Sequence, residues 1–242
     1  MSLAAEERMK KLKQIYEGKA KILYETESPE LLIQYFKDDA TAFNAKKKGT
    51  IDQKGIMNNK ISAKIFEFLQ AQGIPTHFEK ILNEREMLVK RVQIVPIEVI
   101  IRNKAAGSLS RLLALPEGKE LACPILEFCY KEDSLGDPMI TEYHIRALQW
   151  ATDEEVKIIS NYALKINILL SKFFLKLKLE LIDFKLEFGR YKGKIILADE
   201  ISPDTCRLWE VGTGKKLDKD RFRQDLGNIE EAYQEVLSRV LK

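Results

Sequence analysis

The chain has 242 residues, with 40 lysines and arginines against 37 aspartates and glutamates, and a formal net charge of +3. This near-neutral balance does not indicate a nucleic-acid partner, so any affinity for anions must come from local clusters. Three cysteines, an odd number without metal-type spacing, argue against a disulfide scaffold and fit reduced thiols in the cytoplasm. Two histidines are too few for a multi-histidine metal site. The apolar runs are too short to cross a bilayer, so no membrane partner is expected.

The first predicted elements are two strand pieces between residues 14 and 24, bent at Gly18. Lys19 and Lys21 share one face of this hairpin. A glycine-bent hairpin that carries lysines can lie over the phosphates of a nucleotide, so both lysines are candidates for contacting those phosphates. On its own the signal is weak, because one glycine and two lysines are a common surface pattern.

The spacing of apolar and polar residues predicts the next elements. They are a strand over 31–36, a polar loop over 38–55 that contains Asn44, a helix over 56–72, and strands over 76–83 and 86–92. We expect residues 1–88 to form a first domain and residues 89–242 a second. By analogy of fold alone, a chain that crosses between two lobes over 88–92, which includes Lys90, can offer backbone groups to the adenine edge of ATP, as the hinge of a protein kinase does.

A β-branched run predicts a buried strand over 95–102, with Glu98 and Arg102 on one face. Buried charges need partners. A helix is expected to start near Ser108, and Arg102 beside that start forms a plausible phosphate or carboxylate site. A structural arginine next to a helix cap explains the same residues equally well.

The remaining elements, apart from one hairpin, are predicted as a strand over 123–131, a loop over 133–141, a helix from Thr152 to about 178, and a final helical region over 218–241 interrupted at Gly227. Thr152 and Glu155 form a capping box at the start of the long helix. Its apolar stripe is typical of a core helix.

The stretch 181–207 is the most informative, because it reads as a β-hairpin followed by a polar loop. Its first arm alternates strictly, with Asp183, Lys185 and Glu187 on one face and apolar residues on the other. Chain reversal can bring Asp199 back toward Glu187. Two carboxylates beside a lysine suit Mg²⁺ held together with phosphate oxygens. A surface strand with chance charges is less favoured, because further polar residues follow at once.

The turn of this hairpin decides whether the two carboxylates can share a metal, since a shift of one residue reverses the face of a strand. A two-residue turn at Lys192 and Gly193 would set Glu187 opposite Ala198 and send Asp199 to the far side. We therefore expect either a loop with an odd number of residues or a bulge in the second arm.

Three motifs together resemble those of the SAICAR synthetase family. They are residues 95–108 (VPIEVIIRNKAAGS), 181–189 (LIDFKLEFG) and 198–207 (ADEISPDTCR), and residues 16–21 (YEGKAK) and 218–223 (DKDRFR) also fit. The resemblance runs in order from near Ile15 to near Leu241. The chain departs from the family at Asn44, where aspartate is common, and this leaves the role of that loop open.

The resemblance implies an α+β fold in which a small N-terminal antiparallel-sheet domain, similar to a kinase N-lobe, precedes a larger α+β domain, with ATP in the cleft between them. It also implies a ligase of purine biosynthesis. Such an enzyme joins L-aspartate to the carboxylate of carboxyaminoimidazole ribonucleotide (CAIR), forming SAICAR, ADP and phosphate through an acyl phosphate. We expect Mg²⁺ as the cofactor and a homodimer as the assembly.

Carried onto this sequence, the family roles make Glu187 and Asp199 the Mg²⁺ ligands and Lys19 and Lys21 the phosphate contacts. The groups that would hold CAIR are Glu98, Arg102, Ser108 and Arg207. Asp183 and Lys185 would lie beside the reacting carboxylate.

Two other functions fit parts of the sequence. A small-molecule kinase could use the same ATP cleft, but it would need no aspartate and would form no amide, and the chain has no His-Arg-Asp or Asp-Phe-Gly motif. A non-catalytic nucleotide-binding module would be expected to lack one of the two acids, and here both Glu187 and Asp199 are present.

Overall fold

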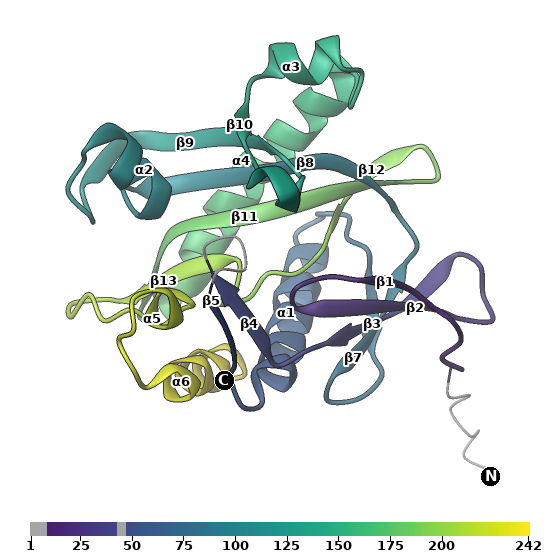
Figure 1. Ribbon diagram of the computed structural model, residues 1–242, viewed down its shortest axis with the longest axis horizontal. Coiled ribbons are helices and arrows are strands. Elements are labelled where there is room, and N and C mark those ends of the chain that lie inside the picture. The colour runs from purple at the N-terminus through teal and green to yellow at the C-terminus, as the bar shows by residue number, and fades with distance from the viewer. Residues whose placement is uncertain (1–8, 43–46) are drawn as a thin grey trace.

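The structure is a computed structural model that describes residues 9–42 and 47–242 (Figure 1). In the described residues the first sheet is antiparallel, with the order β1-β2-β3-β7-β6. Its strands are β1 (Gln14–Glu17), β2 (Lys21–Glu25), β3 (Leu31–Phe36), β6 (Phe78–Ile81) and β7 (Glu86–Lys90). Helix α1 (Lys54–Ala71) packs against this sheet through a buried face that includes Ile61, Ile65 and Leu69.

The second sheet has the order β10-β9-β8-β11-β12, and β13 pairs with β11 beyond this path. Its strands are β8 (Gln93–Lys104), β9 (Glu120–Tyr130), β10 (Met139–Ile140), β11 (Leu179–Tyr191), β12 (Lys194–Ala198) and β13 (Cys206–Glu210). Pairing throughout is antiparallel. The antiparallel sheets and the helices that cover them form the α+β fold expected from the sequence.

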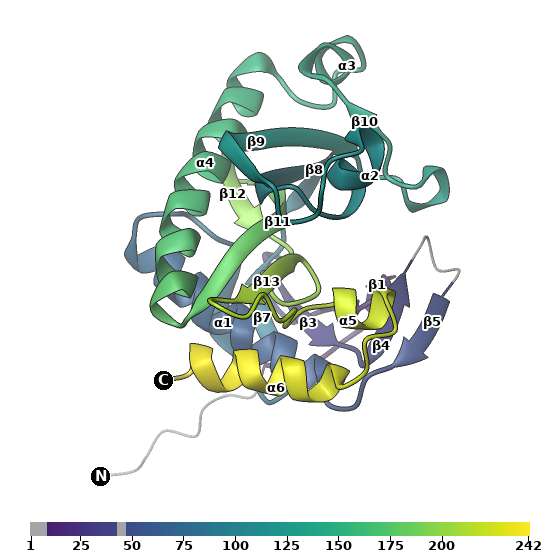
Figure 2. The ribbon, with the colours of Figure 1, turned by 90° about the vertical axis from the view of Figure 1, so that its left-hand side faces the viewer.

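Helix α4 (Asp153–Lys176) runs along one face of the second sheet (Figure 2). The predicted capping box of Thr152 and Glu155 is confirmed at its start. By length and composition α4 could span a membrane. Its buried stripe, which includes Ile159, Ile166 and Leu170, instead belongs to the hydrophobic core of the protein.

The remaining helices are short, apart from the last. They are α2 (Gly107–Leu113), the 3-10 turn η1 (Asp133–Leu135), α3 (Glu142–Ala147), α5 (Asp220–Arg223) and α6 (Ile229–Val240). The predicted break at Gly227 is confirmed between α5 and α6, where this glycine has a φ of 67°. Helix α3 was not predicted, because six residues give too little periodicity to distinguish a helix from a loop.

One hydrophobic core runs beneath both sheets, from Leu32 of β3 to Val240 of α6. The chain changes sheets between β7 and β8, so the predicted domain boundary after residue 88 falls inside β7 and stays a prediction. Helix α6 returns from the end of the chain to pack against α1. Both halves of the sequence therefore contribute to the layer around α1.

The polar stretch 38–55 contains a hairpin of β4 (Asp39–Ala42) and β5 (Lys47–Thr50) and the start of α1, so the prediction of a loop was wrong. The partners that fold it come from far along the chain. Ala40 and Ile51 form a small core with Phe222, and Lys47 Nζ donates to the carbonyl of Phe222 at 2.6 Å. Asn44 lies outside the described residues.

The turn between β11 and β12 also differs from the expectation. Tyr191 pairs with Lys194 and Glu187 with Ala198, so the loop has two residues and the second arm contains no bulge. Lys192 and Gly193 both have positive φ, at 49° and 75°, as a type I′ turn requires. The expectation of an odd loop or a bulge was therefore wrong.

Candidate active site

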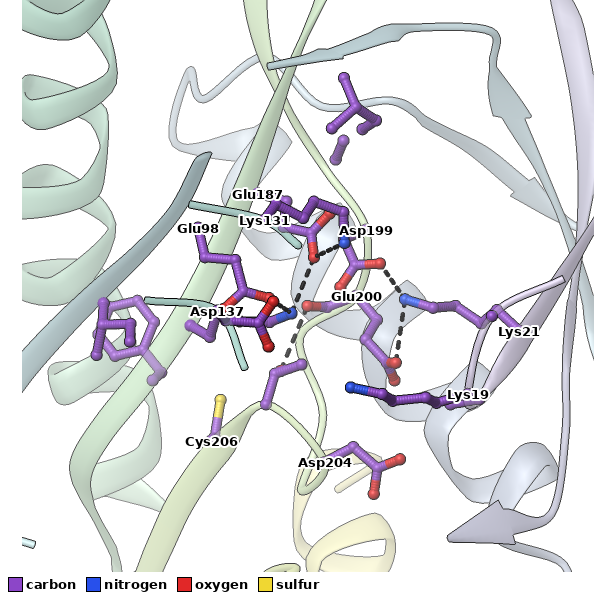
Figure 3. Close-up of a pocket in the computed structure, with 18 of the residues that line it drawn as sticks. Lys19, Lys21, Glu98, Lys131, Asp137, Glu187, Asp199, Glu200, Asp204 and Cys206 are labelled. Atoms are coloured by element: carbon purple, nitrogen blue, oxygen red, sulfur yellow. Dashed lines mark hydrogen bonds and ion pairs between the residues drawn. The ribbon is translucent and has the colours of Figure 1, made fainter. Parts of the chain in front are cut away.

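A cavity of about 700 Å³ lies between the first sheet and the open face of the second sheet. The structure brings every site residue predicted from the sequence to its wall. These residues are Lys19, Lys21, Lys90, Glu98, Arg102, Ser108, Asp183, Lys185, Glu187, Asp199 and Arg207. Figure 3 shows that the labelled side chains come from several elements and converge on one space.

A chain of alternating charges crosses the floor of the cavity. Lys185 Nζ donates to Glu98 at 2.6 Å and to Glu187 at 2.8 Å, and Lys131 Nζ donates to the same Glu187 oxygen, Oε1, at 2.9 Å. Burial alone lowers the pKa of Lys185, but Glu187 and Glu98 outweigh it and raise that pKa well above its usual value. The ammonium group therefore stays charged beside the two carboxylates.

Asp199 lines the same cavity, although the alternation of the strand would place its side chain on the other face. It follows β12 directly and has a φ of 65°, in the left-handed region that only a few non-glycine residues adopt. The side chain accepts a hydrogen bond from Lys21, and Figure 3 shows it beside Glu187. Burial raises the pKa of Asp199, but Lys21, Lys185 and Lys131 together hold it well below its usual range.

Glu187 and Asp199 fit a magnesium ion that arrives with a nucleotide. Among residues 9–42 and 47–242, no donor hydrogen-bonds to Oε2 of Glu187 or to Oδ2 of Asp199, so each carboxylate keeps one oxygen for a ligand. In the same ranges no group of three or more metal-binding side chains occurs. Mg²⁺ commonly takes one or two protein carboxylates and completes its shell with phosphates and water.

The far side of the cavity carries two arginines that share Asp183. Arg102 donates to Asp183 Oδ2 at 3.1 Å and Arg207 donates to the same oxygen at 2.8 Å. Arg102 also donates to the hydroxyl of Ser108 at 2.8 Å, at the start of α2. The predicted need of Arg102 for buried partners is met by Asp183 and by Glu127 at 2.8 Å. Two fixed guanidinium groups beside a hydroxyl suit a phosphate or carboxylate.

Gly107 allows this close packing. Its φ is 56°, and a Cβ atom there would lie 2.3 Å from Nη2 of Arg207. Only glycine lets the backbone lie this close to the guanidinium group.

The opposite end of the cavity is more apolar. Leu23, Leu32 and Val89 line it, and Lys90 donates to the carbonyl of Thr76 at 3.0 Å. Lys19 lies at the tip of the β1–β2 hairpin, where its ammonium is 2.6 Å from Asp133 of η1. An apolar slot flanked by lysines suits the flat base and the phosphates of a nucleotide.

Sequence reasoning missed several residues of the wall. Lys131 pairs with Glu187, Glu200 lies 3.1 Å from Lys21, and Lys219 and Asp204 line the cavity near Arg223. Glu200, Asp204, Lys219 and Arg223 stand inside motifs that were quoted, but no periodicity distinguished them from their neighbours. Lys131 lies outside the quoted motifs, and only its place directly after β9 brings it to Glu187.

His77 is a buried wall residue at the apolar end, with an exposed fraction of 3%. Its ring packs edge-on against Phe66, and its Nε2 has no hydrogen-bond partner among the described residues. Burial lowers the pKa of His77 to about 3, so the imidazole is neutral in the folded protein.

We expect His77 to make the protein less stable in mild acid. As the pH falls below 6.5, the usual pKa of histidine, His77 binds a proton in the unfolded chain. In the folded protein its imidazole stays neutral until about pH 3. The free energy of unfolding should therefore fall by about 1.4 kcal/mol per pH unit from this group, or about 2 kcal/mol between pH 7 and pH 5. Urea unfolding of the wild-type protein and of His77→Gln at pH 7, 6 and 5 measures this change in the free energy of unfolding. The same dependence of the free energy of unfolding on pH in both proteins would contradict the expectation. The substitution His144→Gln, at an exposed histidine, is the control.

Comparisons with known proteins identify the family of this chain. The family model described as SAICAR synthetase matches residues 14–240. A phosphoribosylaminoimidazole-succinocarboxamide synthase of Clostridium novyi (strain NT) is 61% identical over 228 residues, which cover 94% of this chain and 97% of the relative.

Solved structures give the same result. The crystal structure of phosphoribosylaminoimidazole-succinocarboxamide synthase from Ehrlichia chaffeensis has a TM-score of 0.93 and 50% identity, covering 95% of this chain and 98% of the other. A SAICAR synthetase in complex with ADP has a TM-score of 0.90 and 47% identity, covering 93% and 96%. The chain therefore belongs to the SAICAR synthetase family.

Proposed function

We propose that the protein joins L-aspartate to CAIR in an ATP-dependent reaction that yields SAICAR, ADP and phosphate. The observation that carries this proposal is one cavity that holds both a carboxylate pair beside lysines and an arginine pair beside a serine. The first group suits a metal nucleotide and the second suits a phosphorylated carboxylate substrate. A single reaction that uses both needs both groups within one space.

The chemistry follows from the poor reactivity of a carboxylate. A carboxylate oxygen of CAIR attacks the γ-phosphorus of ATP, the bond to the β-phosphate oxygen breaks, and ADP leaves. The amine of aspartate then attacks the acyl phosphate, phosphate leaves with the bonding electrons, and the amine loses a proton. The protein has to align these groups and neutralise the charge that develops.

Each wall residue has a role in this proposal. Glu187 and Asp199 would hold Mg²⁺, which neutralises phosphate charge when bound with the nucleotide. Lys19, Lys21 and Lys90 would contact ATP. CAIR would be held by Glu98, Arg102, Ser108 and Arg207. Asp183 and Lys185 would lie beside the reacting carboxylate, and Asp183 would also orient both arginines through its contacts.

We further propose that the enzyme works in the cytoplasm as a homodimer. The exposed outer side of α4 carries Leu164, Ile168 and Leu175, which are 41%, 56% and 57% exposed. Apolar side chains at this helical spacing are a suitable surface for a second copy. Sedimentation velocity of the full chain tests the assembly, and a monomer at micromolar concentration would contradict it.

We expect ADP formation to require CAIR, aspartate and Mg²⁺ together, since only amide ligation uses all three. A coupled ADP assay with single omissions, paired with chromatography for SAICAR, measures this. Equal ADP release without aspartate would point to a kinase or an ATPase. A product without an amide bond would also contradict the proposal.

A further inference from the structure

The buried face of α1 is polar where the helix begins and apolar further along. Residues four apart share one face of a helix, so Lys54, Asn58 and Ser62 form a stripe. Ile65 and Leu69 continue this face into the hydrophobic core. All three polar side chains of the stripe are fully buried. Because buried polar groups are costly without partners, other polar groups must face this stripe.

Two residues of the stripe bind the loop that follows β12. We call residues 199–205 the acidic loop. Lys54 Nζ donates to Oδ2 of Asp204 at 2.6 Å, and the hydroxyl of Ser62 donates to the carbonyl of Ile201 at 3.1 Å. The polar stripe of α1 therefore lies beneath the acidic loop.

Asn58 lies between these two residues on the same face of the helix, so it faces the underside of the acidic loop. Within residues 9–42 and 47–242, neither its Nδ2 nor its Oδ1 has a hydrogen-bond partner, although the side chain is fully buried. A buried amide without partners is costly. Polar positions of this kind commonly hold an ordered water molecule, which makes about three hydrogen bonds. The backbone of the acidic loop is the nearest polar surface that the stripe contacts, so it can supply the other partners of such a water.

The opposite side of the acidic loop faces the first sheet. Asp199 accepts a hydrogen bond from Lys21, and Oε1 of Glu200 lies 3.1 Å from the same ammonium group. Figure 3 shows both carboxylates directed toward Lys21, with Asp204 further along the loop. The backbone of Asp199 has a φ of 65°, a conformation that persists only where the surrounding structure fixes it. The acidic loop is thus held between Lys21 on one side and α1 on the other.

We propose that Asn58 binds an internal water molecule beneath the acidic loop and is thereby a positioning residue for Asp199. Hydrogen bonds from the stripe fix the loop from below, so Asp199 keeps the backbone that turns its carboxylate toward Glu187. Asn58 is not part of the cavity wall, so it acts through the loop alone. This inference rests on the proposed function, in which Asp199 and Glu187 hold Mg²⁺.

The first test is Asn58→Leu, which removes the amide and keeps a side chain of similar size. With Mg²⁺ present, we expect the affinity for ADP to fall about three- to tenfold, as for one lost hydrogen bond. Without Mg²⁺, the affinity should stay within about twofold of the wild-type value. Isothermal titration with ADP, once with Mg²⁺ and once with a chelator, measures both. Asn58→Ser keeps a polar group and leaves room for water, so it should recover part of the loss.

Asn59→Leu is the matched control on the same helix. Asn59 is also fully buried, but its Nδ2 donates to the carbonyls of Asn83 and Glu84, between β6 and β7. Losing these bonds should lower the melting temperature without changing the effect of Mg²⁺ on ADP binding. An Asn58→Leu protein with wild-type affinity, or with equal losses with and without Mg²⁺, would overturn the positioning role. Should this variant fail to fold, the smaller Asn58→Ala is measured against the same two outcomes.

A crystal structure of the wild-type protein that resolves ordered water tests the water site directly. We expect a water hydrogen-bonded both to Asn58 and to the backbone of residues 199–205. An amide of Asn58 without a water, or with a water that does not reach the loop, would overturn this site.

Failure of the proposed function is seen separately. Wild-type protein that forms no SAICAR from CAIR, aspartate and Mg-ATP would contradict that function before any variant is measured. Wild-type protein that forms SAICAR, together with an Asn58→Leu variant that binds ADP and Mg²⁺ normally, would contradict only the role of Asn58.

Discussion

Glu187→Gln should lower kcat by on the order of 100-fold or more, because even partners that only orient metal ligands change activity 10- to 100-fold. The amide keeps the shape of the side chain and can still accept from Lys185 and Lys131. It removes the negative charge that would face Mg²⁺. Steady-state turnover across a range of Mg²⁺ concentrations measures the effect, and part of the loss should be recovered at high Mg²⁺.

The fold should survive this change. Lys185 keeps its 2.6 Å contact with Glu98, so no buried ammonium loses all of its partners. Glu180→Gln is the matched control, since it lies on the same strand with a side chain that is 41% exposed and pairs with Lys104. Near-normal turnover by a folded Glu187→Gln protein would contradict a metal role for this carboxylate.

Arg207→Ala should weaken CAIR binding about tenfold or more and leave Mg-ATP binding close to that of wild type. A hydrogen bond to a charged group contributes about 1.5–3 kcal/mol, which corresponds to that change in affinity. Isothermal titration with CAIR and with Mg-ATP separates the two effects. Arg207→Lys should recover little, because a lysine cannot reproduce a planar two-pronged contact.

Arg207→Ala should also make the folded protein less stable. Without Arg207, the buried Asp183 depends on Arg102 alone, so some loss of stability is expected, and binding has to be measured well below the melting temperature. The exposed Arg146→Ala is the control for a lost surface arginine. Unchanged CAIR affinity together with weaker Mg-ATP binding would move Arg207 to the nucleotide subsite.

Much of the second sheet could be predicted from the sequence, because local patterns determine it. The alternation around Lys185 gives the two faces of β11, and the capping box at Thr152 marks the start of α4. The position of Asp199 could not be predicted in this way. Its left-handed backbone turns the carboxylate toward Glu187 despite the two-residue turn, and a tertiary contact with Lys21 accompanies this conformation.

The remaining wall residues depend on contacts between distant parts of the chain. Lys131 and Glu187 are brought together by the pairing of three strands, and Lys54 and Asp204 by the packing of α1 beneath the loop after β12. Residue type and spacing carry no information on such pairs. The hairpin of β4 and β5 depends in the same way on Phe222.

The backbone of Leu197 links the second sheet to the segment that leads into β6 of the first sheet. Its carbonyl accepts from the amide of His77 at 2.8 Å, its own amide donates to Pro75 at 2.9 Å, and it pairs with Phe188 within the second sheet. A motion that opens the cavity and keeps these bonds pivots near Leu197, and it also breaks the contact of Lys19 with Asp133 across the cavity. Asp199, two residues further on, would travel least, while the tip of the β1–β2 hairpin with Lys19 would travel furthest. Substrate entry would then change the position of Lys19, which we propose contacts phosphate, while Glu187 and Asp199, which we propose hold Mg²⁺, keep their mutual geometry.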